Sequence, residues 1–333
     1  MTKETSDVIV SSRVRLVRNL KDHVFPSKLD RQQAIDLVED VHTKLLDLGL
    51  NYKKLWTMDE FHKQALIEQK ILSSELAKSK RPMGLLMNDE KTESILLGGN
   101  DHFRLQFSLP GVSLRETWEQ VNRLDDKIGE VFDYAFNEKY GYLTAFPTNV
   151  GTGLRASCIL HLPILSKSKT FKSLQEEMSR IGLNLKAMGE NNGDLYRLSN
   201  QKTLGQSESD LVESVERIAL QLAGQEQKVQ EDALKKQYDE IEDEVYKSFG
   251  VLKYARKLSV KEAMMYLSQL RLGVCSGVIS LDKEVDIYQL MIGSLPGNLK
   301  VYAGKDLENS EILKARAAYL REQLPNLSSE RKN

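Results

Sequence analysis

Cysteine is scarce in this sequence, and long apolar runs do not occur. The 333 residues include two cysteines, Cys158 and Cys275, whose wide separation excludes a disulfide framework and a short-spaced metal site. No apolar run approaches the ~20 residues that span a membrane, and residues 1–5 hold no apolar leader core. We therefore expect a cytoplasmic protein with no membrane partner and no dedicated metal site built from side chains.

The chain also lacks an excess of charge of either sign. Its 47 Lys and Arg residues face 48 Asp and Glu residues, which leaves a formal net charge of −1. Because no global field attracts polyanions, nucleic acid is not an expected partner. A hydrophobic content of 41% and a charged content of 29% are typical of a globular protein. Any phosphate binding must therefore depend on local groups of basic residues.

Hydrophobic periodicity predicts a mixed α/β (α+β) fold. Helical spacing dominates 31–78, and the strand-like runs that follow are 83–87, 94–97, 103–107, 141–144, 156–162, 183–186 and 195–199. The first three runs form a meander, which favours an antiparallel sheet flanked by helices. A helix is expected from Ser113 to Ala135, with Ser113 and Glu116 forming a capping box.

The C-terminal third of the chain is predicted to be helical. A long helix begins near Ser207 and runs toward Phe249, where Gly250 is expected to end it. Shorter helices are expected over 259–272 and 311–323. We therefore expect a catalytic domain over 1–225 and a C-terminal helical extension over 226–333, through which a homodimer is conceivable.

The segment from Pro147 to Ser157, with the sequence PTNVGTGLRAS, is the most informative motif in the chain. Its glycines allow close approach of the backbone, and Arg155 near its end supplies a forked cation. Such a combination suits a polyphosphate. An ordinary connection between a loop and a strand can have the same composition, so this second interpretation stays open.

Three further blocks accompany this motif: SSRVRLVRNL at 11–20, NDHFRLQ at 100–106 and SNQKTLG at 199–205. Together the blocks resemble the catalytic domain of the phosphagen (guanidino) kinases, most closely the bacterial protein-arginine kinases, from about Val8 to Leu272. The resemblance implies a guanidino-kinase catalytic fold, Mg²⁺ and ATP as cofactors, ATP and ADP as ligands, and arginine-containing proteins as acceptors.

The resemblance also implies a set of nucleotide-binding residues. Arg13 and Arg15 alternate along a strand, so both guanidiniums point to one face. They correspond to arginines that hold phosphates in the family, and Arg104 and Arg155 match two more. The other candidates are Ser12, Ser157 and Lys186. Lys186 takes the position of a further family arginine across a one-residue gap, and it offers a point charge rather than a fork.

The residues expected to contact the acceptor guanidinium, here called the acceptor side, depart from the family pattern. Two consecutive Glu residues precede Asp-His in the family, and the second is taken as the base; here these positions are Gly99 and Asn100. Asn can orient an N–H donor but cannot take its proton. Because general-base help is worth ~10²–10⁴ in rate, attenuated transfer is expected. Glu190 matches the family's second acidic residue, on a shortened loop, although a solvated role is equally open.

Other departures lie outside the phosphate site. Phe146 replaces a family Cys, and Lys70 stands near the position of a family His beside the adenine. A C-terminal phosphoarginine-docking motif keeps only Arg316 and Ala317, so this sensing function is expected to be lost. The expected role of His102, Arg18 and Asn19 is to support the fold.

Three functions are compatible with this pattern. The chain is either an ATP:guanidino phosphotransferase with weakened chemistry, a nucleotide-binding pseudokinase that regulates or scaffolds a partner such as an active relative, or a structural protein without a ligand. The four matching arginines argue against the third. Whether the chain is an enzyme depends on Asn100 and Glu190. Mg²⁺ is expected to be held mainly by nucleotide phosphates and water.

Overall fold

Strand pairing dominates the first two thirds of the chain. The computed structural model describes residues 7–328, so residues 1–6, on which the leader prediction rests, lie outside it. Within the described part, an eight-stranded sheet has the order β2-β3-β4-β5-β1-β8-β10-β9, and all its neighbouring pairs are antiparallel, as predicted. The strands are β1 (Ile9–Arg18), β2 (Asn51–Lys54), β3 (Gly84–Met87), β4 (Glu93–Leu97), β5 (Phe103–Pro110), β8 (Leu154–His161), β9 (Leu183–Ala187) and β10 (Leu195–Asn200). A separate ribbon pairs β6 (Phe136–Asn137) with β7 (Gly141–Tyr142).

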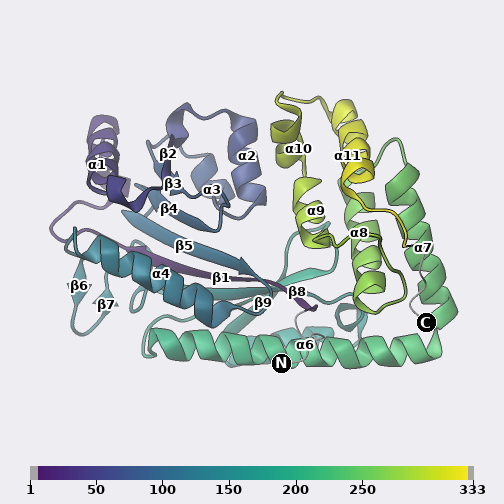
Figure 1. The fold of residues 1–333 in the computed structure, drawn as a ribbon. Coiled ribbons are helices and arrows are strands. Elements are labelled where there is room, and N and C mark those ends of the chain that lie inside the picture. The colour runs from purple at the N-terminus through teal and green to yellow at the C-terminus, as the bar shows by residue number, and fades with distance from the viewer. Residues whose placement is uncertain (1–6, 329–333) are drawn as a thin grey trace.

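Helices cover the sheet and form the C-terminal extension (Figure 1). Those of the sheet-bearing part are α1 (Arg31–Lys44), α2 (Glu60–Glu68), α3 (Ser74–Ala77), α4 (Leu114–Gly129), α5 (Phe171–Arg180) and α6 (Glu208–Lys236). The extension consists of α7 (Tyr238–Tyr254), α8 (Val260–Cys275), α9 (Ile287–Gly293), α10 (Pro296–Ala303) and α11 (Asn309–Gln323). No helix in the described part is long and apolar enough to cross a membrane.

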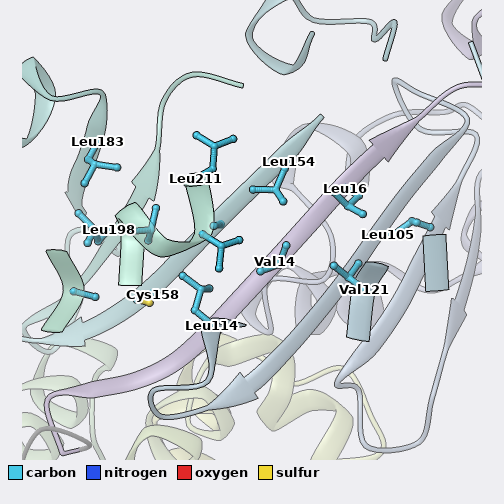
Figure 2. Packing of buried hydrophobic residues seen from close by; sticks show 14 of the residues in the cluster. Val14, Leu16, Leu105, Leu114, Val121, Leu154, Cys158, Leu183, Leu198 and Leu211 are labelled. Carbon is cyan, nitrogen blue, oxygen red and sulfur yellow. The ribbon is translucent and has the colours of Figure 1, made fainter. Parts of the chain in front are cut away.

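The two faces of the sheet differ in chemistry because side chains alternate along each strand. Val14 and Leu16 of β1 point to one face, where they pack with Leu105, Leu154 and Cys158 in the core beneath α4 and α6 (Figure 2). Burial of such side chains stabilises the fold by roughly 1.5–3 kcal/mol each. Arg13 and Arg15, which alternate with these residues along β1, therefore present their side chains to the opposite face, where the candidate site lies.

Several element boundaries differ from the prediction. Ser113 precedes α4, but it makes no capping box, because its hydroxyl donates to the Pro110 carbonyl instead. The long C-terminal helix is two helices, separated at Gln237, whose φ of −142° is not helical. Gly250 lies inside α7, so its prediction as a helix end is wrong. Helices α9 and α10 are short and were not predicted.

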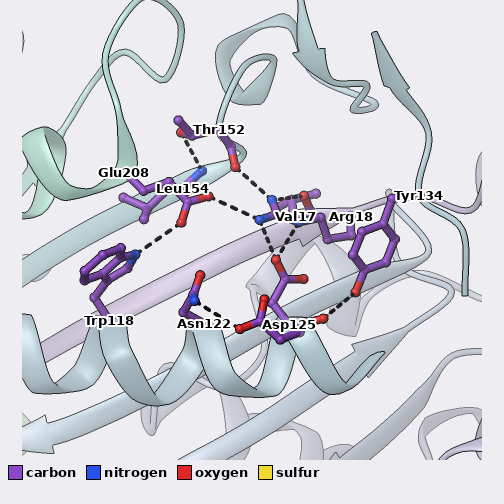
Figure 3. Close-up of polar contacts among 10 residues, drawn as sticks. Val17, Arg18, Trp118, Asn122, Asp125, Tyr134, Thr152, Leu154 and Glu208 are labelled. Carbon is purple, nitrogen blue, oxygen red and sulfur yellow. Dashed lines mark hydrogen bonds and ion pairs between the residues drawn. The ribbon is translucent and has the colours of Figure 1, made fainter. Parts of the chain in front are cut away.

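Arg18 links three elements beneath the sheet (Figure 3). The side chain is 1% exposed and donates to Asp125 Oδ2 of α4 from Nε at 2.9 Å and from a terminal nitrogen at 2.6 Å. It also reaches Glu208, the first residue of α6, at 3.2 Å, and the Thr152 carbonyl at 2.8 Å. Its guanidinium lies 3.6 Å from the centre of the Tyr142 ring. These contacts confirm the structural role predicted for Arg18.

Replacing Asp125 with Ala is expected to lower the free energy of unfolding by about 3–5 kcal/mol, because the Arg18 charge stays buried without its main partner. Urea denaturation of both proteins measures this change. Asp126→Ala is the matched control, since Asp126 is exposed on the same helix and its loss should cost no more than about 0.5 kcal/mol. Equal effects of the two substitutions would contradict the assignment.

Candidate functional site

A cavity of about 350 Å³ opens on the polar face of the sheet. Basic side chains make up half of its lining, to which no Asp or Glu among residues 7–328 contributes. The basic residues are Arg13, Arg15, Lys70, Arg104, Arg155 and Arg197. Ser157 and Gln106 add polar groups between them. A concave site with this lining selects a ligand that carries several negative charges.

Strand register explains why the arginines converge. Arg15 of β1 lies directly opposite Arg155 of β8, and Arg13 lies opposite Ser157, so all four side chains share one face. On the other side of β1, Arg104 of β5 is opposite Val17 and shares that face. Residues from three adjacent strands are therefore brought together, including all four predicted arginines.

The glycines of the 147–157 motif serve the packing of the chain. Gly151 has a φ of +111°, and a Cβ there would lie 2.4 Å from the Thr203 carbonyl. Gly153 has a φ of +66°, and its Cβ would lie 2.6 Å from the carbonyl of Val17. The close approach that the sequence suggested for a ligand is thus made by the chain itself. These contacts fix the start of β8 and so the position of Arg155.

Burial and repulsion between neighbouring cations lower the pKa of five basic residues in the cavity, namely Arg13, Arg15, Lys70, Arg104 and Arg155. Burial and then Arg197 lower the pKa of Arg13 to about 10. Burial, with Arg104 and Arg155, holds the pKa of Arg15 well below its ordinary value. The pKa of Lys70 is also lowered, first by burial and then by Arg13 and Arg197. A bound polyanion would relieve this repulsion.

Three of the cavity guanidiniums are only partly hydrogen-bonded to residues of 7–328. Arg13 donates to the Lys70 carbonyl at 3.1 Å, Arg104 donates to the Ile71 carbonyl, and Arg155 donates to the Asn200 carbonyl at 2.9 Å. The buried Nε atoms of Arg15, Arg104 and Arg155 have no partner among the described residues. Buried donors are normally satisfied, so these three indicate an external acceptor. Phosphate oxygens fit this requirement.

Asn100 and its neighbours lie beyond the end of β1. The half-buried Asn100 side chain makes no hydrogen bond with any residue in 7–328. Two hydrogen bonds fix the Asp101 side chain: its Oδ1 accepts one from Asn19 Nδ2 at 2.7 Å and one from the Ala145 amide at 2.6 Å. Burial lowers the pKa of His102 to about 4, which keeps the imidazole neutral beside Asn19. His102 therefore supports the fold, as predicted.

Three predicted site residues do not line the cavity. Ser12 follows the alternation of β1 to the opposite face, where its buried hydroxyl donates to the Gly111 carbonyl at 2.7 Å. Lys186 is exposed on the edge strand β9. Glu190 is exposed on the loop that follows β9. Ser12 and Glu190 are therefore separated from the arginines, whereas Lys186 shares their face opposite Arg197 but does not line the cavity.

The helical extension holds the loop that carries Glu190. Asp194 accepts a hydrogen bond of 2.6 Å from Ser268 of α8. Gly193 packs so closely on α8 that a Cβ there would lie 2.9 Å from the Met264 carbonyl, and Met188 packs on the core of the extension. These contacts fix the position of the loop relative to α8.

Two further residues singled out in the sequence also lie outside the cavity. Phe146 is 44% exposed and directly precedes the turn at Pro147–Asn149. Arg316 is 1% exposed and donates to the carbonyls of Ser294 and Leu258, so it holds the extension together.

Sequence reasoning did not select Arg197, although it lines the cavity. The sequence shows only that Arg197 and Ser199 share a face of their strand; the structure adds that the Cα of Ser199 lies opposite that of Ser157. The period of a strand places both on the arginine-bearing face.

Comparison with known families identifies two matching regions. Residues 33–229 match the model of the ATP:guanido phosphotransferase C-terminal catalytic domain. Residues 238–333 match the model of the protein-arginine kinase McsB C-terminal domain.

Known proteins give the same result over the whole length. The protein-arginine kinase of Caldanaerobacter subterraneus subsp. tengcongensis is 37% identical over 97% of this chain and 99% of its own length. That of Desulforamulus reducens is 36% identical over 99% of this chain and 95% of its own. The crystal structure of lombricine kinase aligns with a TM-score of 0.59 and 25% identity, over 71% of this chain and 68% of that one.

Fold similarity extends further, to the substrate-free duplicated taurocyamine kinase of Schistosoma mansoni, with a TM-score of 0.61 and 19% identity. The alignment covers 93% of this chain and 49% of that one. With the family models and the relatives taken together, this chain belongs to the ATP:guanido phosphotransferase family and is a kinase-family protein of the protein-arginine kinase type.

Proposed function

We propose that this protein binds ATP or ADP in the arginine-lined cavity and transfers the γ-phosphoryl group of ATP to arginine side chains of proteins at an attenuated rate. The observation that carries the proposal is the cavity itself. Its lining has six basic residues and no acidic one, and the buried Nε donors of Arg15, Arg104 and Arg155 lack acceptors among the described residues. A lining of this kind is suited to neutralising the negative charge of a triphosphate.

The proposed division of labour follows from the contacts. The carbonyls of residues 70, 71 and 200 fix the guanidiniums of Arg13, Arg104 and Arg155, which leaves their other N–H groups for phosphate oxygens. Preorganised donors of this kind stabilise charge without reorganising during the reaction. Ser157 supplies a hydroxyl between them.

Mg²⁺ would enter the site with the nucleotide. In the part of the chain that the structure describes, no group of three His, Cys, Asp or Glu residues could hold a metal ion, and no carboxylate lines the cavity. Phosphate oxygens and water are then the fitting ligands, since Mg²⁺ readily keeps several waters. When bound, the ion would neutralise charge on the phosphates.

Attenuation follows from the acceptor side. The carbonyl oxygen of Asn100 can accept a hydrogen bond from a guanidinium and orient it, but it cannot take the proton. Glu190 is exposed, and its loop is tied to α8 through Asp194 and Gly193. No acidic residue between 7 and 328, Glu190 included, lines the cavity. The γ-phosphoryl group would thus pass to a positioned guanidinium with ADP as the leaving group, and the guanidinium proton would go to water instead of a side-chain base, at a cost of ~10²–10⁴ in rate.

A nucleotide-binding pseudokinase that acts as a regulatory or scaffolding partner is the second candidate. The contact between Asp194 and Ser268 of α8 favours it, because loop closure normally completes the acceptor site in kinases. In that case the protein would bind ATP and arginine-containing partners without transferring phosphate.

Formation of acid-labile phosphoarginine tests the proposal. The protein is incubated with Mg-ATP and an arginine-rich protein, and ³¹P NMR follows the product. We expect a slow signal that grows with protein concentration and disappears in Arg155→Gln, which excludes a contaminating kinase. Nucleotide binding without any product would favour the pseudokinase. Absence of both would refute both candidates.

A further inference from the structure

We propose that Arg197 is a phosphate-binding residue that holds the part of the nucleotide farthest from the guanidinium acceptor. This inference rests on the proposed function and deepens it. Arg197 lies on β10, outside the motif blocks that indicated the other arginines. It nevertheless lines the same cavity as Arg13, Arg15 and Arg155. Its side chain makes no hydrogen bond or ion pair with any residue between 7 and 328.

Register places Arg197 along the axis of β1. Arg197 pairs with Ile159 of β8, and Ile159 pairs with Ser11 of β1. Arg197 is therefore level with a residue two positions before Arg13. At the other end of the row, Arg104 is level with Val17. The arginines thus span six residues of strand, or about 20 Å between the backbones at the two ends.

The acceptor side lies at the Arg104 end of this row. Asn19 directly follows β1, and its amide donates to Asp101, the neighbour of Asn100. The phosphoryl group that is transferred must lie close to the acceptor. Arg197, at the opposite end, is then positioned for phosphate that stays with the nucleotide.

Arg197 also interacts electrostatically with the other basic residues that line the cavity. Its charge contributes to the lowered pKa of Arg13, Arg155 and Lys70, in each case after burial. Groups that repel one another this way gain most from a shared anion. Lys186, by contrast, is exposed on the edge strand, although its Cα lies opposite that of Arg197. Arg197 therefore supplies a forked cation where the sequence alone suggested a lysine.

Calorimetric titration of Mg-ADP and Mg-ATP tests the assignment. Arg197→Gln is expected to weaken both ligands by the same factor, roughly 10- to 100-fold for lost charge-assisted hydrogen bonds. Arg104→Gln, at the acceptor end, should weaken ATP more than ADP. Arg123→Gln, which removes an exposed arginine on α4, serves as the comparison and should bind like the unmodified protein.

Stability separates a binding role from a structural one. Because Arg197 repels its neighbours, Arg197→Gln should have an unchanged or higher midpoint of thermal unfolding without nucleotide, and Mg-ADP should raise that midpoint less than in the unmodified protein.

Unchanged affinity for both ligands, or a loss confined to ATP, would overturn the inference. If Arg197→Gln does not fold, Arg197→Lys keeps the charge without the fork, and equal affinity in that variant would also overturn it. No binding by the unmodified protein would instead refute the proposed function.

Discussion

Asn100→Glu is expected to increase the rate of phosphoarginine formation by ~10²–10⁴, the largest change that a single substitution should produce here. A carboxylate at this position can accept the proton that the acceptor guanidinium must lose, which the amide cannot do. Asn100 is half-buried and forms no hydrogen bond with the described residues, so the longer side chain displaces no existing contact. Initial rates from ³¹P NMR, at saturating Mg-ATP, measure the gain.

Asn100→Gln distinguishes the effect of a base from the effect of a longer side chain, because Gln matches Glu in length but remains neutral. It should show no gain over the unmodified protein. Affinity for Mg-ADP should be similar in all three proteins, since the cavity arginines are unchanged. If Asn100→Glu binds nucleotide but forms product no faster than Asn100→Gln, the missing base does not limit this protein.

Arg15→Gln is expected to reduce affinity for Mg-ADP by more than 100-fold. Arg15 lies between Arg104 and Arg155, whose charges act on it most strongly, and its Nε is buried without a partner among the described residues. A guanidinium can give two parallel hydrogen bonds to phosphate. Each charge-assisted bond is worth about 1.5–3 kcal/mol, so losing two exceeds 100-fold. Calorimetric titration measures the loss.

Removal of this charge should also stabilise the protein without ligand, because it relieves repulsion within the cluster. Thermal unfolding without nucleotide is then expected at an equal or higher temperature for Arg15→Gln than for the unmodified protein. Arg123→Gln removes an exposed arginine on α4 and should change neither quantity. A destabilised Arg15→Gln with unaltered affinity would mean that Arg15 serves the fold.

The sheet and part of the site could be predicted because both depend on local periodicity. Alternation along β1 placed Arg13 and Arg15 on one face, and the paired strands confirm that face. The same alternation excludes Ser12, the residue beside Arg13, whose hydroxyl bonds the Gly111 carbonyl on the other side. Local pattern was sufficient in both cases, although the resemblance had included Ser12.

Long-range pairing accounts for what the sequence could not reveal. Arg197 belongs to the site through the pairing of β10 with β8, and register between such distant segments is not readable from either one. The position of Glu190 depends on where α8 packs, through the contact of Asp194 with Ser268. Helix breaks were also context-dependent, since α7 continues through Gly250 despite the low helix propensity of glycine.

Calorimetric titration of Mg-ADP into the unmodified protein and into Arg15→Gln is the most direct test of the account, because every part of it depends on the arginine-lined cavity being the nucleotide site. We expect one molecule of ADP to bind per chain, with binding lost in the variant and with no binding of adenosine, which lacks phosphate. Failure of the unmodified protein to bind Mg-ADP, or equal binding by Arg15→Gln, would contradict the account.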